Sequence, residues 1–201
     1  MRILFCKIAH MKYYKGICNN DKPYNGGDYV KKTGKANEQY NFAPVSVDDN
    51  KRKVCLGFFE TKSTNRTSIN QLHIEKINGC EALKKTDKID DVLVVWCATA
   101  DTNECVVVGW YKNATVYRNY CEYLFKDETD EEDYIHLCNI IADYKDCVLL
   151  PADGTRRRWS VPDSRKSTYG FGQSLVWYAK EKEAESYLKS LIVSIHRAFC
   201  P

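Results

Sequence analysis

The sequence lacks the signatures that mark membrane, secreted and repeat proteins. No window of the 201 residues is long and apolar enough to cross a bilayer as a helix. Lys7 interrupts the apolar stretch after Met1-Arg2, so the beginning of the chain does not resemble a secretory signal. No internal repeat is present. We therefore expect a soluble protein of the cytoplasm with no membrane partner.

Complete catalytic and cofactor-binding motifs are also missing. Gly27 and Gly34 are too far apart for a phosphate-binding loop, and Ala36 stands where such a loop needs a hydroxyl residue for Mg²⁺. No serine lies in a G-x-S-x-G turn, and the four histidines form no H-E-x-x-H pattern. The expectation is a protein without a cofactor, a bound metal or a catalytic residue of its own.

Ten cysteines are present, but none forms a C-x-x-C pair of the kind that zinc knuckles and redox sites use. Most lie in apolar runs, such as those around Cys6, Cys55 and Cys97, where a thiol packs as a small hydrophobic side chain. This pattern predicts reduced cysteines in the core.

One nuclease-like pattern is partly present. Asp49, the apolar run 54–59 and then Glu60 and Lys62 resemble the D…E-x-K arrangement, in which two carboxylates hold Mg²⁺ and a lysine stabilises developing charge. The pattern is short and arises readily by chance. A metal-dependent nuclease using these three residues therefore remains an alternative hypothesis.

The charges nearly balance in number but are separated along the chain. There are 30 Lys and Arg against 27 Asp and Glu, which gives a net charge of +3. Residues 126–133 are acidic and residues 155–166 are basic. A local basic face is compatible with such a total. The length is typical of one domain, and we expect residues 1–201 to be one domain at the N-terminal part of a longer protein.

Hydrophobic patterning predicts a mixed α+β fold: a small, curled, mostly antiparallel β-barrel with flanking helices. Apolar or alternating runs indicate strands at 3–8, 54–59, 92–98, 105–111, 114–120 and 147–150. A 3.6-residue period predicts a helix at 183–199 and favours shorter helices at 130–142 and 68–77. The polar stretch 15–44 is expected to be a long functional loop.

Aromatic residues gather beside glycines and cations in loop-like sequence. The chain has 14 Tyr, 7 Phe and 4 Trp. Tyr13 and Tyr14 follow the first strand, and Trp159 follows three consecutive arginines. A flipped base needs flat faces for stacking and polar groups for its edge, and cations hold its phosphates. Aromatics and cations together thus suggest a base-binding site.

Five segments resemble an N-terminal domain of bacterial proteins that are often fused to HNH nucleases. They are Ile3–Gly16, Gly26–Val30 with Glu38–Phe42, Val94–Thr99, Val107–Arg118, and Gly170–Ser174 with Val176–Ala179. The domain is similar to the EVE domain of the PUA, YTH and SRA group, whose small curled barrels read modified or flipped bases. The resemblance implies a DNA-binding module that flips a methylated or hydroxymethylated base into an aromatic pocket. Its partner would be duplex DNA, and an HNH nuclease of a restriction system would cut.

The resemblance also suggests residues for the site. The pocket walls would be Tyr13, Tyr14, Phe42, Trp110 and Trp159, and the base edge would be read by Asn41, Ser68 and Asn70. The phosphates would be held by Lys12, Lys15, Arg156, Arg157, Arg158, Arg165 and Lys166. The family often has Trp where this chain has His10, whereas Trp96 belongs to a continuous apolar strand and is expected in the core. An RNA reader of the same fold and a sensor of a free nucleotide remain alternatives.

Overall fold

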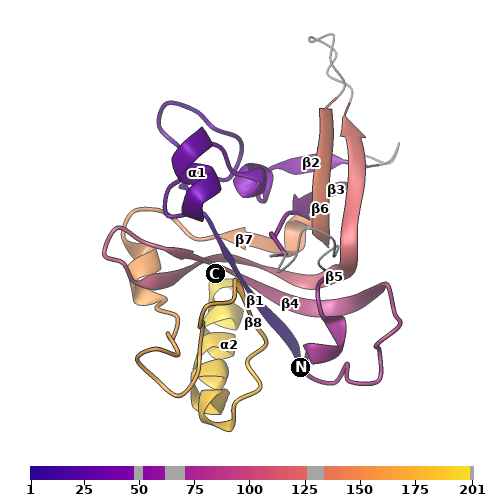
Figure 1. Cartoon of the computed structure of the whole chain (residues 1–201), viewed down its shortest axis with the longest axis vertical. Helices are drawn as coiled ribbons and strands as arrows, with labels where there is room; N and C mark the ends of the chain where they lie inside the picture. The colour runs from indigo at the N-terminus through magenta and orange to yellow at the C-terminus, as the bar shows by residue number, and fades with distance from the viewer. Residues whose placement is uncertain (48–51, 62–70, 126–133, 200–201) are drawn as a thin grey trace.

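The computed structural model describes residues 1–47, 52–61, 71–125 and 134–199, and these form one curved sheet with helices packed around it (Figure 1). The strands of this part are β1 (Arg2–Ile8), β2 (Pro44–Ser46), β3 (Lys53–Gly57), β4 (Lys88–Thr99), β5 (Cys105–Phe125), β6 (Tyr134–Asp143), β7 (Cys147–Leu149) and β8 (Val176–Trp177). The α-helices are α1 (Gly27–Thr33) and α2 (Glu185–Phe199). The short 3₁₀ helices are η1 (Asn37–Tyr40), η2 (Ile74–Lys76), η3 (Tyr144–Asp146), η4 (Thr155–Arg158) and η5 (Lys182–Ala184).

The sheet is mostly antiparallel and open. Its strand order is β2-β3-β6-β5-β4-β1-β8, with β7 paired to β5. Only β1 and β4 run parallel among the strand pairs described. The mixed α+β class expected from the sequence is confirmed, but within the described chain the sheet does not close into a barrel. The two terminal strands, β2 and β8, are three and two residues long. Such short edges cannot supply the staggered ladder that closure needs.

Strand β5 joins the two halves of the sheet. It spans 21 residues and replaces the two separate strands expected at 105–111 and 114–120. Its first part pairs with β4 and its last part with β6, and the register shifts between Val116 and Cys121. In Figure 1, β5 turns from its course beside β4 into an upright pair with β6. Bulges of this kind bend a sheet without breaking its hydrogen bonds elsewhere.

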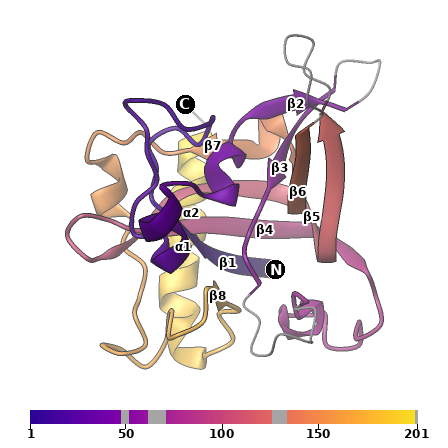
Figure 2. The ribbon, with the colours of Figure 1, turned by 45° about the horizontal axis from the view of Figure 1, so that its top comes forward.

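The core lies on both faces of the sheet. Along β1, Leu4, Cys6 and Ile8 belong to one buried cluster, whereas Ile3 and Phe5 belong to a second. This alternation is the period-2 pattern of a strand that is buried on both sides. The second cluster is completed by Leu191 and Ile195 of α2, which lies along one side of the sheet (Figure 2).

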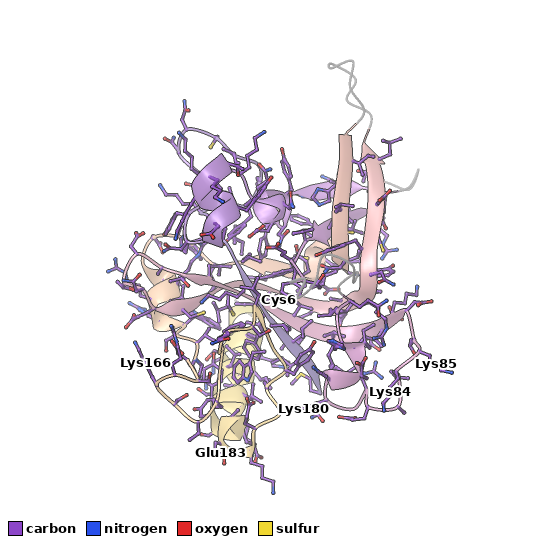
Figure 3. All side chains as sticks on the ribbon, viewed as in Figure 1. Cys6, Lys84, Lys85, Lys166, Lys180 and Glu183 are labelled. Carbon is purple, nitrogen blue, oxygen red and sulfur yellow. The ribbon has the colours of Figure 1, made fainter. Side chains whose placement is uncertain are left out.

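The core contains most of the cysteines, as the sequence predicts. Eight of the nine cysteines in the described part are buried or partly buried, and Cys18 is exposed. Cys6 lies on β1 in the interior of the molecule (Figure 3). Trp96 is also fully buried, as expected.

The helices were anticipated less well than the strands. The helix expected at 183–199 is confirmed as α2, preceded by η5. The helix expected at 130–142 is wrong, because Tyr134–Asp143 is strand β6 between β3 and β5. A short apolar run fits the period of a helix as well as that of a strand. Pairing with β3 and β5 made this segment a strand. Within 68–77 only η2 is helical in the described residues, and the loop expected at 15–44 contains α1 and η1.

Candidate nucleic-acid interface

Two of the expected pocket walls, Tyr14 and Phe42, hold the core together. Tyr14 is fully buried, and its hydroxyl donates to the Ala9 carbonyl at 2.8 Å and accepts the Met11 N–H at 3.1 Å. Burial raises the pKa of Tyr14 far above its ordinary value. Phe42 lies between the rings of Tyr14 and Tyr111, with centroids 5.7 and 5.4 Å away. Neither ring presents a face on which a base could stack in this conformation.

Asn41, the expected reader of a base edge, binds the backbone instead. Its side-chain amide donates to the Phe58 carbonyl at 3.0 Å and accepts the Phe58 N–H at 2.9 Å. Asn139 makes the same pair of bonds to Phe59, at 2.9 and 3.1 Å. The two buried amides thus hold consecutive residues at the end of β3. The only sequence signal for Asn139 is a polar residue within the apolar run of β6.

The two tryptophans of the expected pocket pack against each other with their ring planes tilted by 31°. Trp110 is fully buried on β5, and Trp159 is half-buried with its ring centroid 5.2 Å from that of Trp110. Trp159 therefore covers the second core cluster. Of the five expected walls, Tyr13 alone is largely exposed, at 53%.

Arg156 connects two segments that are far apart in the sequence. The three consecutive arginines Arg156, Arg157 and Arg158 lie on the 3₁₀ helix η4. Arg156 is 4% exposed, and its guanidinium donates to the carbonyls of Leu150, Met11 and Lys12 at 3.0, 2.5 and 2.6 Å. All three directions of the guanidinium are used within the protein. Its role is therefore to fasten η4 to the loop after β1 rather than to hold a phosphate.

The Arg156 contacts bring together five exposed side chains, which we call the basic surface: Lys12, Tyr13, Lys15, Arg157 and Arg158. A 3₁₀ helix has three residues per turn, so Arg157 and Arg158 point away from the inward direction of Arg156. In Figure 2, the short helix at 155–158 lies at the edge of the molecule on the side of α1. Four of the side chains are cations, and the fifth is an aromatic ring.

Asp21 fixes the loop half of the basic surface. This carboxylate is 2% exposed, and its two oxygens accept the N–H groups of Lys12 at 2.6 Å and Tyr13 at 2.8 Å. Because Asp21 binds the backbone at consecutive residues, the starting positions of the Lys12 and Tyr13 side chains are set. The loop half of the basic surface is therefore held in place by hydrogen bonds within the protein.

Sequence reasoning missed further cations on the same lobe. Lys22, Lys31, Lys32 and Lys35 are exposed, and α1 packs on the chain after β1 through Val30 and Ala9. The composition of this segment already indicated a surplus of cations, since residues 11–40 contain six lysines and only three acids, Asp21, Asp28 and Glu38. Only Asp28 of these acids is exposed. The lobe is thus more basic at its surface than its composition indicates.

Arg165 and Lys166 lie on a separate loop between η4 and β8. The Arg165 guanidinium pairs with Asp163 at 2.5 Å, and this pairing lowers the pKa of Asp163 well below its ordinary value. The pair is exposed, so its energetic contribution is small. Lys166 points outward from the ribbon (Figure 3). The contacts that unite the basic surface do not include these two residues.

His10 occupies a confined position behind the basic surface. Its backbone pairs with Tyr24, and the two rings lie 4.6 Å apart. The ring is 9% exposed, and Nδ1 meets no hydrogen-bond partner in the described chain. Burial, together with the nearby Arg156 cation, lowers the pKa of His10 to about 4. The imidazole is therefore neutral at physiological pH.

The described residues contain only part of the expected nuclease pattern. Ser68 and Asn70 of the expected pocket, and Asp49 and Lys62 of the nuclease pattern, lie outside the described residues. Glu60 is exposed after β3, beside Thr61, whose N–H donates to the Tyr120 hydroxyl at 2.9 Å. In the described residues, no group of three His, Cys, Asp or Glu side chains is arranged to hold a metal ion.

The chain matches no family model, no curated protein and no solved structure. In the part that the structure describes, neither helix has the length and apolarity needed to span a membrane.

Proposed function

We propose that the protein is a nucleic-acid-binding module of the EVE-like kind, in the PUA, YTH and SRA group, that recognises a modified base in duplex DNA. The observation that carries the proposal is the basic surface, which Arg156 assembles from two segments some 145 residues apart. The mostly antiparallel sheet with one parallel strand pair supports a curled β fold of that general kind.

The chemistry of the basic surface suits a nucleic acid. Exposed Lys and Arg attract phosphates and make binding depend on salt. Tyr13 offers a flat face, on which a base would contribute about 1–3 kcal/mol by stacking. A planar ring among cations distinguishes this surface from a simple anion site. The Asp21 carboxylate and the Tyr14 hydroxyl, which are hydrogen-bonded to the backbone of the loop after β1, would serve as a rigid support.

A direct binding experiment would separate duplex DNA from its competitors. Anisotropy titrations would compare one labelled sequence as unmodified duplex, as duplexes with methyladenine, methylcytosine or hydroxymethylcytosine, and as RNA. We expect tighter binding to one modified duplex and weaker binding as salt rises. Equal affinity for all duplexes would remove the modified-base proposal, and a preference for RNA would favour the RNA reader. Mg²⁺-dependent cleavage lost in Glu60→Ala would favour the nuclease.

Matched variants test the location of the site. The double variant Lys12→Ala, Arg157→Ala should weaken binding to every duplex and reduce the salt slope by about 2, one unit for each phosphate contact. Tyr13→Ala should cost about 1–3 kcal/mol of binding with unchanged folding. The control is Lys84→Ala, Lys85→Ala, which removes two exposed lysines on the loop before β4, on the opposite side of the molecule from α1 (Figure 3). An equal loss in the control would place binding elsewhere.

A further inference from the structure

Asparagine is followed by glycine at two places in the chain, Asn25-Gly26 and Asn78-Gly79. In such a pair, the glycine nitrogen can attack the side-chain carbonyl carbon of the asparagine, because glycine has no side chain that blocks the approach. Both asparagines are exposed. Sequence and exposure alone therefore do not distinguish the two pairs, but their contacts do.

The Asn78 side chain is unrestrained. Residues 77–80 form a tight turn, which is closed by a 3.0 Å hydrogen bond from the Cys80 N–H to the Ile77 carbonyl. Gly79 has a φ of +77°, the positive value that the third residue of a type II turn requires. Among the described residues, the Asn78 amide has no hydrogen-bond partner. A Cβ added at Gly79 would meet no described atom within 4 Å, so the attacking nitrogen lies beside open space.

The Asn25 side chain, by contrast, is held in place. Its amide nitrogen donates to the carbonyls of Thr99 and Ala100 at 3.1 and 3.3 Å. A Cβ added at Gly26 would lie 2.4 Å from a methyl carbon of Val30, which shows that this glycine is tightly packed. Attack by the Gly26 nitrogen would therefore require two hydrogen bonds to break and the glycine to leave its packed position.

We propose that Asn78 is a site of spontaneous deamidation, with water as the only co-reactant, and that the contacts of Asn25 protect the other pair. The proposal is independent of the nucleic-acid function.

The reaction balances with one molecule of water. The Gly79 nitrogen attacks Cγ of Asn78 and forms a new C–N bond in a five-membered imide, an intramolecular step that needs no second molecule. The bond from Cγ to the amide nitrogen breaks, and ammonia leaves with the proton that the Gly79 nitrogen has lost. Water then opens the imide. Attack at Cγ restores the backbone with an aspartate, whereas attack at the backbone carbonyl leaves the chain linked through Cγ as an isoaspartate.

The isoaspartyl product should destabilise the fold around the turn. Ile77 and Cys80, on either side of the reacting pair, are both buried. Isoaspartate adds one methylene group to the backbone between these two core residues. We expect the isoaspartyl protein, separated by ion exchange, to unfold at a lower temperature than Asn78→Asp, which has the new charge without the additional methylene group.

The test follows both pairs in the folded protein and in urea, with water enriched in oxygen-18 as the solvent. Each deamidation then adds one heavy oxygen, which separates it from deamidation during digestion in ordinary water. Trypsin releases residues 77–84, in which Asn78 is the only asparagine. In the folded protein, we expect label at Asn78 to appear at least about tenfold faster than at Asn25, because two hydrogen bonds must break at Asn25. In urea the two rates should become similar.

Matched variants assign the label to the turn. Asn78→Gln should lose the label from its peptide, because the longer side chain would have to form a six-membered ring, which closes much more slowly. Asn25→Gln is the control and should keep the wild-type rate at Asn78. A protein-isoaspartate methyltransferase with a labelled methyl donor should modify aged wild-type protein and should leave aged Asn78→Gln unmodified.

Two results would overturn the proposal. Equal rates at the two pairs in the folded protein, or a faster rate at Asn25, would show that the contacts of Asn25 do not protect it. Label that appears at Asn78 only in urea would show that the turn itself prevents the reaction. Both results come from the wild-type protein, so they do not depend on the folding of any variant.

Discussion

Arg118 and Arg156 are both buried, and each connects segments that are far apart in the sequence. Arg118 pairs with a carboxylate, whereas Arg156 binds backbone carbonyls. Arg118 on β5 donates to the carbonyls of Thr86 and Leu83 and pairs with Glu75 at 2.8 Å. Arg156 uses its guanidinium on three carbonyls. Asp21 acts on Arg156 only at longer range, because its oxygens bind N–H groups of the neighbouring loop.

The comparison explains why the two regions have different surfaces. At Arg118, the Glu75 carboxylate neutralises the cation, and we call this connection between segments the Arg118 joint. At Arg156 the buried positive charge lies directly behind exposed cations. Burial lowers the pKa of Arg156. The guanidinium nevertheless remains charged, because arginine is not deprotonated in proteins at ordinary pH. The positive potential of the basic surface thus has a buried as well as an exposed source.

The largest effect should come from Arg156→Ala. The substitution leaves three carbonyls without their donor, so we expect a loss of about 3–5 kcal/mol in the free energy of unfolding. It should also weaken nucleic-acid binding, since η4 and the loop after β1 lose their connection. Urea denaturation and anisotropy measure the two effects. The matched control is Arg157→Ala, which should change stability by less than about 0.5 kcal/mol. Similar stability losses in both variants would contradict the assignment of Arg156 as the connecting residue.

A smaller effect is expected at the Arg118 joint from Glu75→Gln. Hydrogen bonds from Arg118 and from His73 outweigh desolvation and lower the pKa of Glu75 to about 2. Since the folded value lies below the ordinary 4.5, the stabilisation is present above pH 4.5 and is lost as pH falls toward 2. Glu75→Gln should cost about 1 kcal/mol at pH 7, because the pair is partly exposed.

The pH profile distinguishes this joint from a general acid effect. Urea midpoints between pH 5 and pH 2 should change less in Glu75→Gln than in the wild type. Glu81→Gln, which affects an exposed pair with Lys180, is the control and should keep the wild-type profile. Parallel profiles for wild type and Glu75→Gln would mean that Arg118 holds its segment without the carboxylate.

The smallest effect on stability at neutral pH should come from His10→Phe, which changes a residue near Arg156. The folded pKa of His10 is about 4 against an ordinary 6.5, because burial and Arg156 oppose its cation. The neutral ring therefore favours folding above pH 6.5, and stability falls as pH drops from 6.5 to 4. His10→Phe should reduce the loss of stability between pH 6.5 and 4. It should leave the loss between pH 4.5 and 2, which Glu75 causes, unchanged. Thermal unfolding at pH 7, 5.5 and 4.5 measures the difference, and an unchanged slope would show that His10 is protonated at no cost.

Much of the fold could be predicted because strands and core residues follow local apolar patterns. Val92–Ala98, for example, is continuous and apolar, and it is the buried centre of β4. Strand β6 could not be predicted in this way, since its apolar residues fit a helix equally well until β3 and β5 pair with it. The open ends of the sheet likewise depend on which strands meet.

The candidate site was harder to predict than the fold. Loop aromatics such as Tyr14 and Phe42 can turn inward or outward without any change in the sequence pattern, and both turned inward. Arg156 looks like its neighbours Arg157 and Arg158 in the sequence. Its carbonyl partners lie on another segment, so only the assembled protein distinguishes it from them.

By itself, the sequence determined the mixed α+β class, the strands at 3–8 and 92–98, the helix that ends the described chain, and the burial of most cysteines. These features follow from local periodicity and from the cost of exposing apolar side chains. Tertiary structure alone decided the open sheet, the inward orientation of Tyr14 and Phe42, and the hydrogen bonds of Arg156 to distant carbonyls. Each of these depends on partners brought together by folding, and their positions are not encoded in any single window of the chain.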